Sequence, residues 1–450
     1  MTRRMNNRRR MPWRRLIPLI CLAFWLVSKG LSVQAATAAA PQIYSGFTIA
    51  TNAITGTAVD TGSRGVLYDL DRQQQLPLTL ASRLMLLLLV SESFDAGQMV
   101  TVSSEVAAID EAYPTEDQLT LMTGQRVTVE YLTLRFLYYD SHSAIVALTE
   151  LFNRSIDQMI ALMEARARSL ELAATTFTQK PDSRSTVYEW LPYSPFTSAE
   201  DLMRIQLAIL NNAQGYAYLS RGDAYLQVDA GGRRIVSLRS PLTEYRVLSE
   251  DKISAAYRAS DDQYTLEMVF GITADGIETA CLLVLPGGEA TDGITALFSG
   301  IESFYTRSRL VSRGDVVPSL QETAENGVTF GLVYLDNVSY THPRNDTFLK
   351  ETISYQGNPP YRLPLQTGVA TGQVIFELRN GFRITASVGP DRAILSDNST
   401  YARLLMAMQN NRNLTAILIG TVGLLFLFLL FGTARNVARA LYYRRLGPKR

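Results

Sequence analysis

Histidine, cysteine and lysine are scarce in this sequence, which limits the chemistry that its side chains could perform. His142 and His342 are the only histidines, and one of the two cysteines lies in an apolar N-terminal segment. Zinc sites need clusters of histidine and cysteine, and a Ser-His-Asp triad would have to use one of these two histidines. No glycine-rich phosphate loop follows a predicted strand. We therefore expect neither a metal nor a cofactor, and the remaining options are serine–lysine chemistry or binding.

One segment places a serine three residues before a lysine, Ser249-Glu250-Asp251-Lys252. On a helix this spacing puts both groups on one face, where a lysine of lowered pKa can accept the serine proton. The segment precedes a predicted edge strand and does not start a buried helix. With only two fixed positions, the pattern alone is weak ground for assigning a catalytic site.

The charges are distributed unevenly along the chain. Residues 1–35 carry eight Lys/Arg and no acid, and residues 414–450 carry six and no acid, although the formal net charge is only +1. The middle of the chain then holds 29 basic and 42 acidic residues. Binding to nucleic acid needs a cationic face, so nucleic acid is not an expected partner.

Both ends of the chain have features of membrane targeting. Residues 1–35 are typical of a signal peptide, with a basic start, an apolar run over Leu16–Val27 and the cleavage-type sequence Val33-Gln34-Ala35; an uncleaved anchor is the alternative. Residues 414–433 contain no charge and, at ~1.5 Å per residue, are long enough for a ~30 Å hydrocarbon core; a buried soluble helix is the alternative. The basic residues 434–450 are then cytoplasmic. We expect a cell-membrane protein with one C-terminal transmembrane helix and an extracellular ectodomain.

The ectodomain is expected to contain an α+β domain followed by a small all-β domain. Residues 43–305 begin and end with strand-like patterns around a helical middle, which favours an antiparallel sheet with a helical subdomain. The predicted helices are Leu80–Leu89, Thr128–Tyr138, Ser143–Phe152, Ser155–Leu170, Ser198–Asn211 and Asp292–Tyr305. From about Gln214 the pattern becomes strand-like, with a strand around Tyr245. Residues 306–400 contain short strands and turns such as Asn326-Gly327, and residues 401–413 are expected to form a stalk.

Several stretches, in order, resemble the low-molecular-mass penicillin-binding proteins, the serine D-alanyl-D-alanine carboxypeptidase family with a β-lactamase-like fold. The stretches that carry this resemblance are Leu67–Asp69, Pro77–Met85, Met122–Leu132, Ala144–Glu150, Tyr188–Leu210 and Tyr264–Pro286. The resemblance covers residues 43–305. It implies an extracellular role on the peptidoglycan of a bacterial cell wall.

The active-site positions depart from the family pattern. The family's Ser-x-x-Lys motif supplies the nucleophile and its base, and these positions fall on Leu80 and Arg83. Leucine has no nucleophilic atom, and arginine stays protonated in proteins. The family's Ser-x-Asn motif falls on Asp140-Ser141-His142.

The third motif, Lys-Thr/Ser-Gly, has two possible registers. Counting back from Tyr264 places it on Ala255-Ala256-Tyr257, which lacks all three features. Counting forward from the strand expected at Tyr245 places it on Lys252-Ile253-Ser254, so that Lys252 and Ser254 would remain as substrate-binding residues.

Three functions are consistent with these observations. The first is a catalytically inactive family member that binds peptidoglycan stem peptides or holds a partner cell-wall enzyme. The second is an active carboxypeptidase with a displaced site that uses Ser82, Ser141 or Ser249 with Lys252. The third is an ectodomain scaffold unrelated to peptidoglycan.

Overall fold

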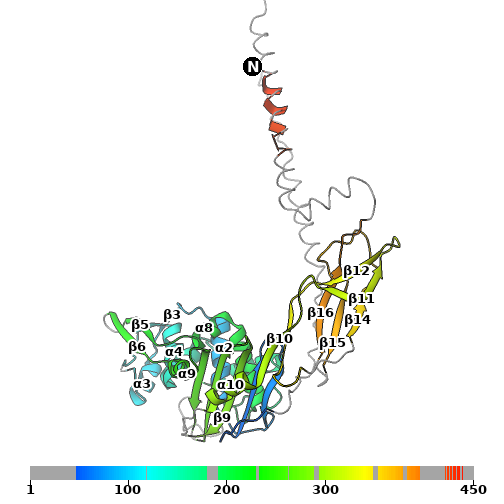
Figure 1. Ribbon diagram of the computed structural model, residues 1–450. Helices are drawn as coiled ribbons and strands as arrows, with labels where there is room; N and C mark the ends of the chain where they lie inside the picture. Colours follow the sequence, from blue (N-terminus) through cyan, green and yellow to red (C-terminus); the bar gives the residue numbers. More distant parts are fainter. Residues whose placement is uncertain are drawn as a thin grey trace, which may run out of the picture. The chain divides into compact units, whose positions relative to one another are not determined.

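The computed structural model describes residues 47–117, 119–179, 191–229, 233–261, 263–287, 293–347, 353–378 and 383–395, together with scattered residues between 421 and 438. Its first sheet has five strands in the order β2-β1-β9-β8-β7 (Figure 1). These strands are β1 (Thr55–Asp60), β2 (Val66–Leu70), β7 (Ile253–Ser260), β8 (Tyr264–Ile272) and β9 (Glu278–Pro286). Every neighbouring pair is antiparallel, as the sequence predicted.

The first sheet separates two hydrophobic cores, and the central strand β9 contributes to both. Successive side chains on a strand point to opposite faces. Ala280, Leu282 and Val284 accordingly belong to the larger core, which contains the helical region. Cys281 and Leu283 belong to the smaller core on the other face, which α10 (Gly293–Phe304) covers. A strand buried on both faces explains why its sequence is almost continuously apolar.

The helical region surrounds α2 (Ala81–Ser93), which is buried from Ala81 to Ser91. Its other helices are α3 (Ser104–Ala112), α4 (Val129–Tyr139), α5 (His142–Glu150), α6 (Ile156–Ser169), α7 (Ala199–Asn211) and α8 (Ala213–Leu219). Two antiparallel strand pairs lie in the same region: β3 (Met99–Thr101) with β4 (Arg126–Thr128), which are separated in the sequence by α3, and the hairpin of β5 (Ala224–Asp229) with β6 (Arg233–Leu238). The predicted helices lie within a few residues of α2, α4, α5, α6, α7 and α10, and Ser198 caps α7 as expected.

Two parts of the prediction after residue 213 are wrong. The segment that begins near Gln214 is helical in α8, where Asn212 caps the first turn through Gly215 N. The expected strand at Tyr245 is helix α9 (Pro241–Leu248), which starts with the cap residue Ser240 and a proline at its first turn. Proline at that position is compatible with a helix because its missing N–H has no intrahelical partner. The spacing of apolar residues in these short segments does not separate a helix from a strand.

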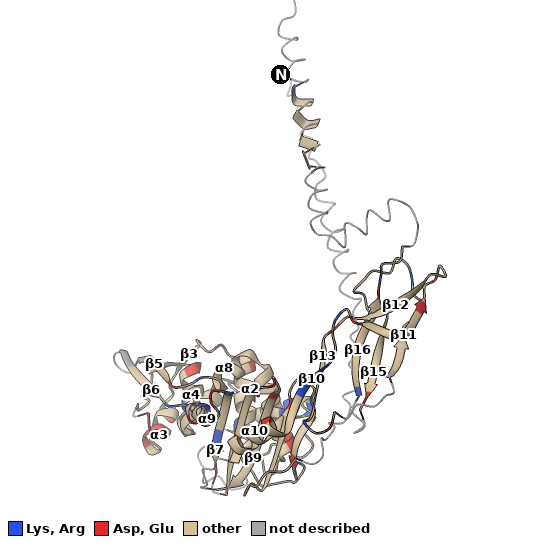
Figure 2. Cartoon of the chain, viewed as in Figure 1, with Lys and Arg blue, Asp and Glu red and all other residues tan. Residues whose placement is uncertain are grey.

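The residues after α10 form further strands. β10 (Tyr305–Val311) pairs with β13 (Val338–Pro343), and Figure 2 shows basic residues on β10. One of these, Arg307, donates a hydrogen bond to the carbonyl of Gly276. A second five-stranded sheet has the order β11-β12-β16-β15-β14 and its own hydrophobic core. Its strands are β11 (Val316–Thr323), β12 (Thr329–Tyr334), β14 (Ile353–Gly357), β15 (Gly372–Glu377) and β16 (Arg383–Pro390).

The expected signal peptide and stalk lie outside the described residues, as does most of the segment 414–433. Among the described residues, no helix has both the length and the apolar character needed to cross a membrane.

Candidate functional site

The position expected for the catalytic lysine holds an arginine that forms an ion pair. Arg83 lies in the first turn of α2, and its side chain is 9% exposed. Its guanidinium donates a hydrogen bond to the Asp140 carboxylate, in the turn between α4 and α5. Burial raises the pKa of the Asp140 carboxyl to about 6, although the Arg83 charge acts in the opposite direction. The two motif positions are therefore close in space, but they carry a salt bridge in place of a base and a hydroxyl.

The position expected for the nucleophile is closed to solvent. Leu80 is 0% exposed at the N-cap of α2 and makes no side-chain cap. Two hydroxyls lie nearby in the sequence: Thr79 donates to Asp261 Oδ2 at 3.2 Å, and Ser82 is 0% exposed. Neither hydroxyl has a described basic group within hydrogen-bond distance. Nucleophilic catalysis by serine requires such a base, so this geometry does not support it.

Tyr257 of the edge strand β7 lies near this ion pair. Its side chain is 2% exposed, and the charges of Asp140 and Arg83 both act on its phenol. Burial, the largest effect, raises the pKa of Tyr257, so the phenol is neutral at physiological pH. Among the described residues its hydroxyl has no hydrogen-bond partner. A large aromatic side chain therefore occupies the strand position at which one register of the third motif expects a glycine.

Ser141 and His142 have structural environments at the start of α5. The Ser141 hydroxyl accepts a hydrogen bond from Ala144 N as the helix cap, and it also accepts one from the Thr115 hydroxyl at 3.0 Å. Burial and the nearby Arg83 charge lower the pKa of His142, which keeps its imidazole neutral at pH 7. The His142 ring lies against Tyr113, with 5.1 Å between ring centroids.

Lys252 and Ser254, the alternative third-motif residues, have other partners. In the part of the chain that the structure describes, Lys252 is the only lysine, and its amine pairs with Glu302 of α10 at 2.9 Å. The Ser254 hydroxyl donates to the Phe270 carbonyl at 3.4 Å. The Ser249 hydroxyl accepts from Ile253 N at 3.1 Å and is not paired with the lysine. The charges of Arg83 and Asp140 therefore act on Tyr257, whereas Lys252 is paired with Glu302.

A buried ionic network holds the loop that precedes β4. Arg135 of α4 is 0% exposed and pairs with Asp110 at 2.8 Å and with Asp117 at 3.0 Å. Its guanidinium also donates to the Leu119 carbonyl at 2.8 Å, and Tyr131 donates to Asp117 at 2.8 Å. Burying charges is costly unless they are paired and hydrogen-bonded, and here both carboxylates have partners. This network was not predicted from the sequence, where an arginine in the apolar run of α4 was the available signal.

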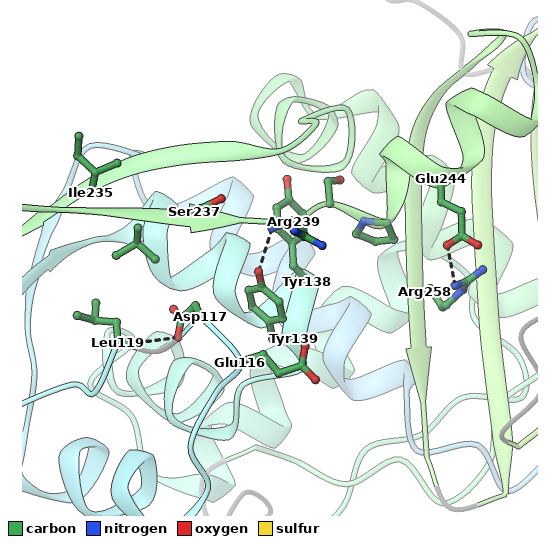
Figure 3. Close-up of a pocket in the computed structure, with 13 residues that line it drawn as sticks. Glu116, Asp117, Leu119, Tyr138, Tyr139, Ile235, Ser237, Arg239, Glu244 and Arg258 are labelled. Carbon is green, nitrogen blue, oxygen red and sulfur yellow. Dashed lines mark hydrogen bonds and ion pairs between the residues drawn. The ribbon is translucent and has the colours of Figure 1, made fainter.

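A cleft of about 860 Å³ adjoins the Asp140 turn. Residues from α4, the loop before β4, the β5–β6 hairpin, α9 and β7 line it (Figure 3). They include Tyr138 and Tyr139, which directly precede Asp140, and Arg258, which directly follows Tyr257. The cleft therefore lies next to the motif positions without containing them.

One end of the cleft contains a fully paired charged group. Arg258 bonds to Glu244 at 3.3 Å and to the buried Glu267 at 3.0 Å, and its guanidinium lies 5.0 Å from the centre of the Tyr245 ring. The Tyr245 hydroxyl also donates to Glu267 at 3.0 Å. These contacts hold α9 against the edge of the sheet and fix this wall of the cleft. They were not predicted from the sequence, because Tyr245 was expected in a strand.

Comparison with known proteins supports the family expected from the sequence. Residues 35–219 match the family model described as D-alanyl-D-alanine carboxypeptidase. The match ends before β7, so it contains the first two motif positions but not the third. No curated protein was found to match the sequence.

Solved structures share this fold at low sequence identity. Penicillin binding protein 5 from Haemophilus influenzae aligns with a TM-score of 0.55 and 16% identity, over 78% of this chain and 100% of that chain. A peptidoglycan synthesis regulatory factor (PBP3) from Streptococcus pneumoniae aligns with a TM-score of 0.61 and 16% identity, over 77% of this chain and 100% of that chain. Penicillin binding protein 6B from Escherichia coli aligns with a TM-score of 0.53 and 14% identity, over 78% of this chain and 98% of that chain. The chain thus has the mixed α/β fold of these proteins.

Proposed function

We propose that this chain, which resembles the low-molecular-mass penicillin-binding proteins, is a non-catalytic member of the D-alanyl-D-alanine carboxypeptidase family that acts by binding. It is retained at the cell surface by a C-terminal helix over residues 414–433, after export through the signal peptide in residues 1–35. In this location it binds peptidoglycan peptides or holds a cell-wall enzyme near the membrane.

The Arg83–Asp140 ion pair is the observation that carries this proposal. Acyl transfer needs a hydroxyl and a group that takes its proton. The first position is the closed Leu80, and the second is a guanidinium held by a carboxylate. Tyr257 adds a bulky side chain near the same pair. A single substitution could not restore the reaction, because nucleophile, base and space are all altered.

A covalent labelling experiment tests the loss of catalysis. The protein is incubated with a fluorescent penicillin next to an active D-Ala-D-Ala carboxypeptidase, and the gel is read for covalent fluorescence. We expect labelling of the active enzyme only. Labelling of this chain, or release of D-alanine from a stem pentapeptide that Lys252→Ala abolishes, would show an active enzyme with a displaced site.

A sedimentation experiment tests the binding role. Purified peptidoglycan is spun down with the protein, and we expect the protein in the pellet. One of the similar structures is described as a peptidoglycan synthesis regulatory factor, which supports testing a regulatory role for this chain too. If the protein stays in the supernatant, a scaffold role unrelated to peptidoglycan is favoured instead.

A further inference from the structure

The β5–β6 hairpin presents a mixed apolar and basic wall to the cleft. Residue Ser237 pairs with Tyr225, and β6 buries Val236 and Leu238, of which Val236 also lines the cleft. Side chains alternate along a strand, so Ile235, Ser237 and the following Arg239 share the exposed face. Ile235 is 76% exposed. Figure 3 shows these three side chains along one side of the cleft, with the apolar residue at one end and the guanidinium further along.

The opposite wall presents an acidic group beside a tyrosine. Tyr139 ends α4, and its hydroxyl accepts a hydrogen bond from Arg239 N at 2.9 Å, which ties the hairpin to the helix. Glu116 is exposed, whereas the neighbouring Asp117 side chain is 0% exposed and bound to Arg135. Figure 3 shows Tyr139 in the cleft with Glu116 and Arg239 beside it. Burial, the largest effect, raises the pKa of the Tyr139 phenol, and the charges of Glu116 and Arg239 act on it in opposite directions.

Glu116 and Arg239 differ from the other charged residues that line the cleft. Arg258, Glu244 and Asp117 all have ion-pair partners. Within the described parts of the chain, neither the Glu116 carboxylate nor the Arg239 guanidinium forms an ion pair or a side-chain hydrogen bond. The cleft thus contains one anionic and one cationic side chain, beside the Tyr139 ring, that have no ion-pair partner among the described residues.

We propose that this cleft binds a short zwitterionic peptide without reacting with it. The peptide carboxylate binds the Arg239 guanidinium, its amino group binds the Glu116 carboxylate, and an apolar side chain lies near Ile235 and Leu119. The cleft volume of about 860 Å³ lies within the ~300–1,000 Å³ of small-ligand pockets. This inference rests on the proposed function, because a cell-wall stem peptide with a diamino acid carries both a free amine and a free carboxylate.

Calorimetric titration of the protein with a defined probe tests the assignment. The probe is N-acetyl-L-Ala-D-isoglutaminyl-L-Lys-D-Ala-D-Ala, which has one amine, on lysine, and one carboxylate, at its C-terminus. Two further forms carry an acetylated lysine or an amidated C-terminus. A charged hydrogen bond contributes ~1.5–3 kcal/mol, so each modification should weaken binding by about tenfold or more.

Matched variants connect each charge of the peptide to one residue. The Arg239→Gln variant should bind the free and the amidated peptide with equal affinity, while acetylation of the lysine still weakens binding. The Glu116→Gln variant should bind the free and the acetylated peptide with equal affinity, while amidation still weakens binding. Arg313→Gln and Glu325→Gln change exposed residues after β10, and in these control variants amidation and acetylation should weaken binding as much as in the wild type. Equal affinity for all three peptides, or variants that weaken binding regardless of the modification, would overturn the assignment.

Two additional arms separate this inference from the proposed function. If both variants sediment with peptidoglycan as well as the wild type does, while no stem peptide binds the cleft, the cleft assignment fails and the proposed function stands. If the wild type does not sediment, the peptidoglycan-binding role in the proposed function fails. An all-L peptide of the same charges that binds equally well would support a zwitterionic peptide site whose ligand comes from a source other than the cell wall.

Discussion

Arg83 donates a hydrogen bond to Asp140 across the interface between the start of α2 and the turn after α4. Asp140 has φ 51°, in the left-handed region that few residues other than glycine adopt. Aspartate tolerates this conformation better than most residues, and its side chain then meets the guanidinium. The pair therefore joins two segments that the family uses for chemistry, and in this chain it serves as a structural contact.

Disrupting this pair should destabilise the protein more than disrupting an exposed pair. Asp140→Leu leaves the Arg83 guanidinium, which is 9% exposed, without its partner, and we expect a loss of ~2–3 kcal/mol. Arg83→Met should lose less, because the Asp140 side chain that it leaves unpaired is 34% exposed. The double variant should lose less than the sum of the two. Arg166→Met and Glu92→Leu form the matched control, because that pair is about 30% exposed on each side and should couple by less than ~1 kcal/mol. Urea denaturation of all six variants gives the two coupling energies, and equal values would contradict the prediction.

Asp140 should also make stability depend on pH between about 4 and 6. Its pKa is raised from 3.8 to about 6 in the folded protein, so the folded state binds more protons than the unfolded state in this range. The free energy of unfolding should therefore fall as pH rises through this window. His142, whose pKa is lowered by burial and by the Arg83 charge, contributes the opposite slope below about pH 6.5. The free energy of unfolding of the wild type minus that of Asp140→Asn isolates the contribution of the aspartate and should decrease as pH rises. If this difference instead increases with pH, it is inconsistent with the pKa shift.

The main helices of the first domain could be predicted because each combines a long apolar pattern with a cap. Ser198 caps α7 through Asp201 N, and Ser155 caps α6 through Gln158 N. Segments of eight residues or fewer gave no comparable signal. The strand expected at Tyr245 is helix α9, which buries Leu242 and Tyr245, and two apolar positions do not define a helical period.

The motif positions could be located from the sequence, but their contacts could not. Spacing placed Arg83 and Asp140 at two motifs, yet only the fold brings their charged groups into contact. The same spacing left the third motif undecided between Lys252-Ile253-Ser254 and Ala255-Ala256-Tyr257. The cleft was not predicted, since it combines Glu116 and Arg239 from segments more than a hundred residues apart.

Introducing a nucleophile and a lysine should not by itself restore reactivity. In the Leu80→Ser/Arg83→Lys variant, the new amine would lie near Asp140, and an adjacent carboxylate raises the pKa of a lysine. The amine would then stay protonated and could not accept the serine proton. We expect no covalent labelling by fluorescent penicillin, as in the Leu80→Ser control.

Adding Asp140→Ser to this double variant removes the opposing carboxylate and should give detectable labelling, although Tyr257 remains nearby. Labelling of the double variant at the rate of an active carboxypeptidase would show that the carboxylate does not restrain the lysine.

The Arg135 network should be the most sensitive ionic site among the described residues. Arg135→Met removes the partner of two carboxylates, Asp110 and Asp117, whose side chains are 1% and 0% exposed. Leaving a buried charge unpaired costs ~3–5 kcal/mol, so the midpoint of urea unfolding should move to a much lower urea concentration. Arg204→Met is the matched control, because Arg204 also pairs with two carboxylates but is 33% exposed and should lose less than ~1 kcal/mol. Hydrogen exchange should increase at Leu121, whose amide bonds to Asp110 at 2.7 Å, in the first variant only. Similar losses in both variants would mean that burial does not set the strength of this network.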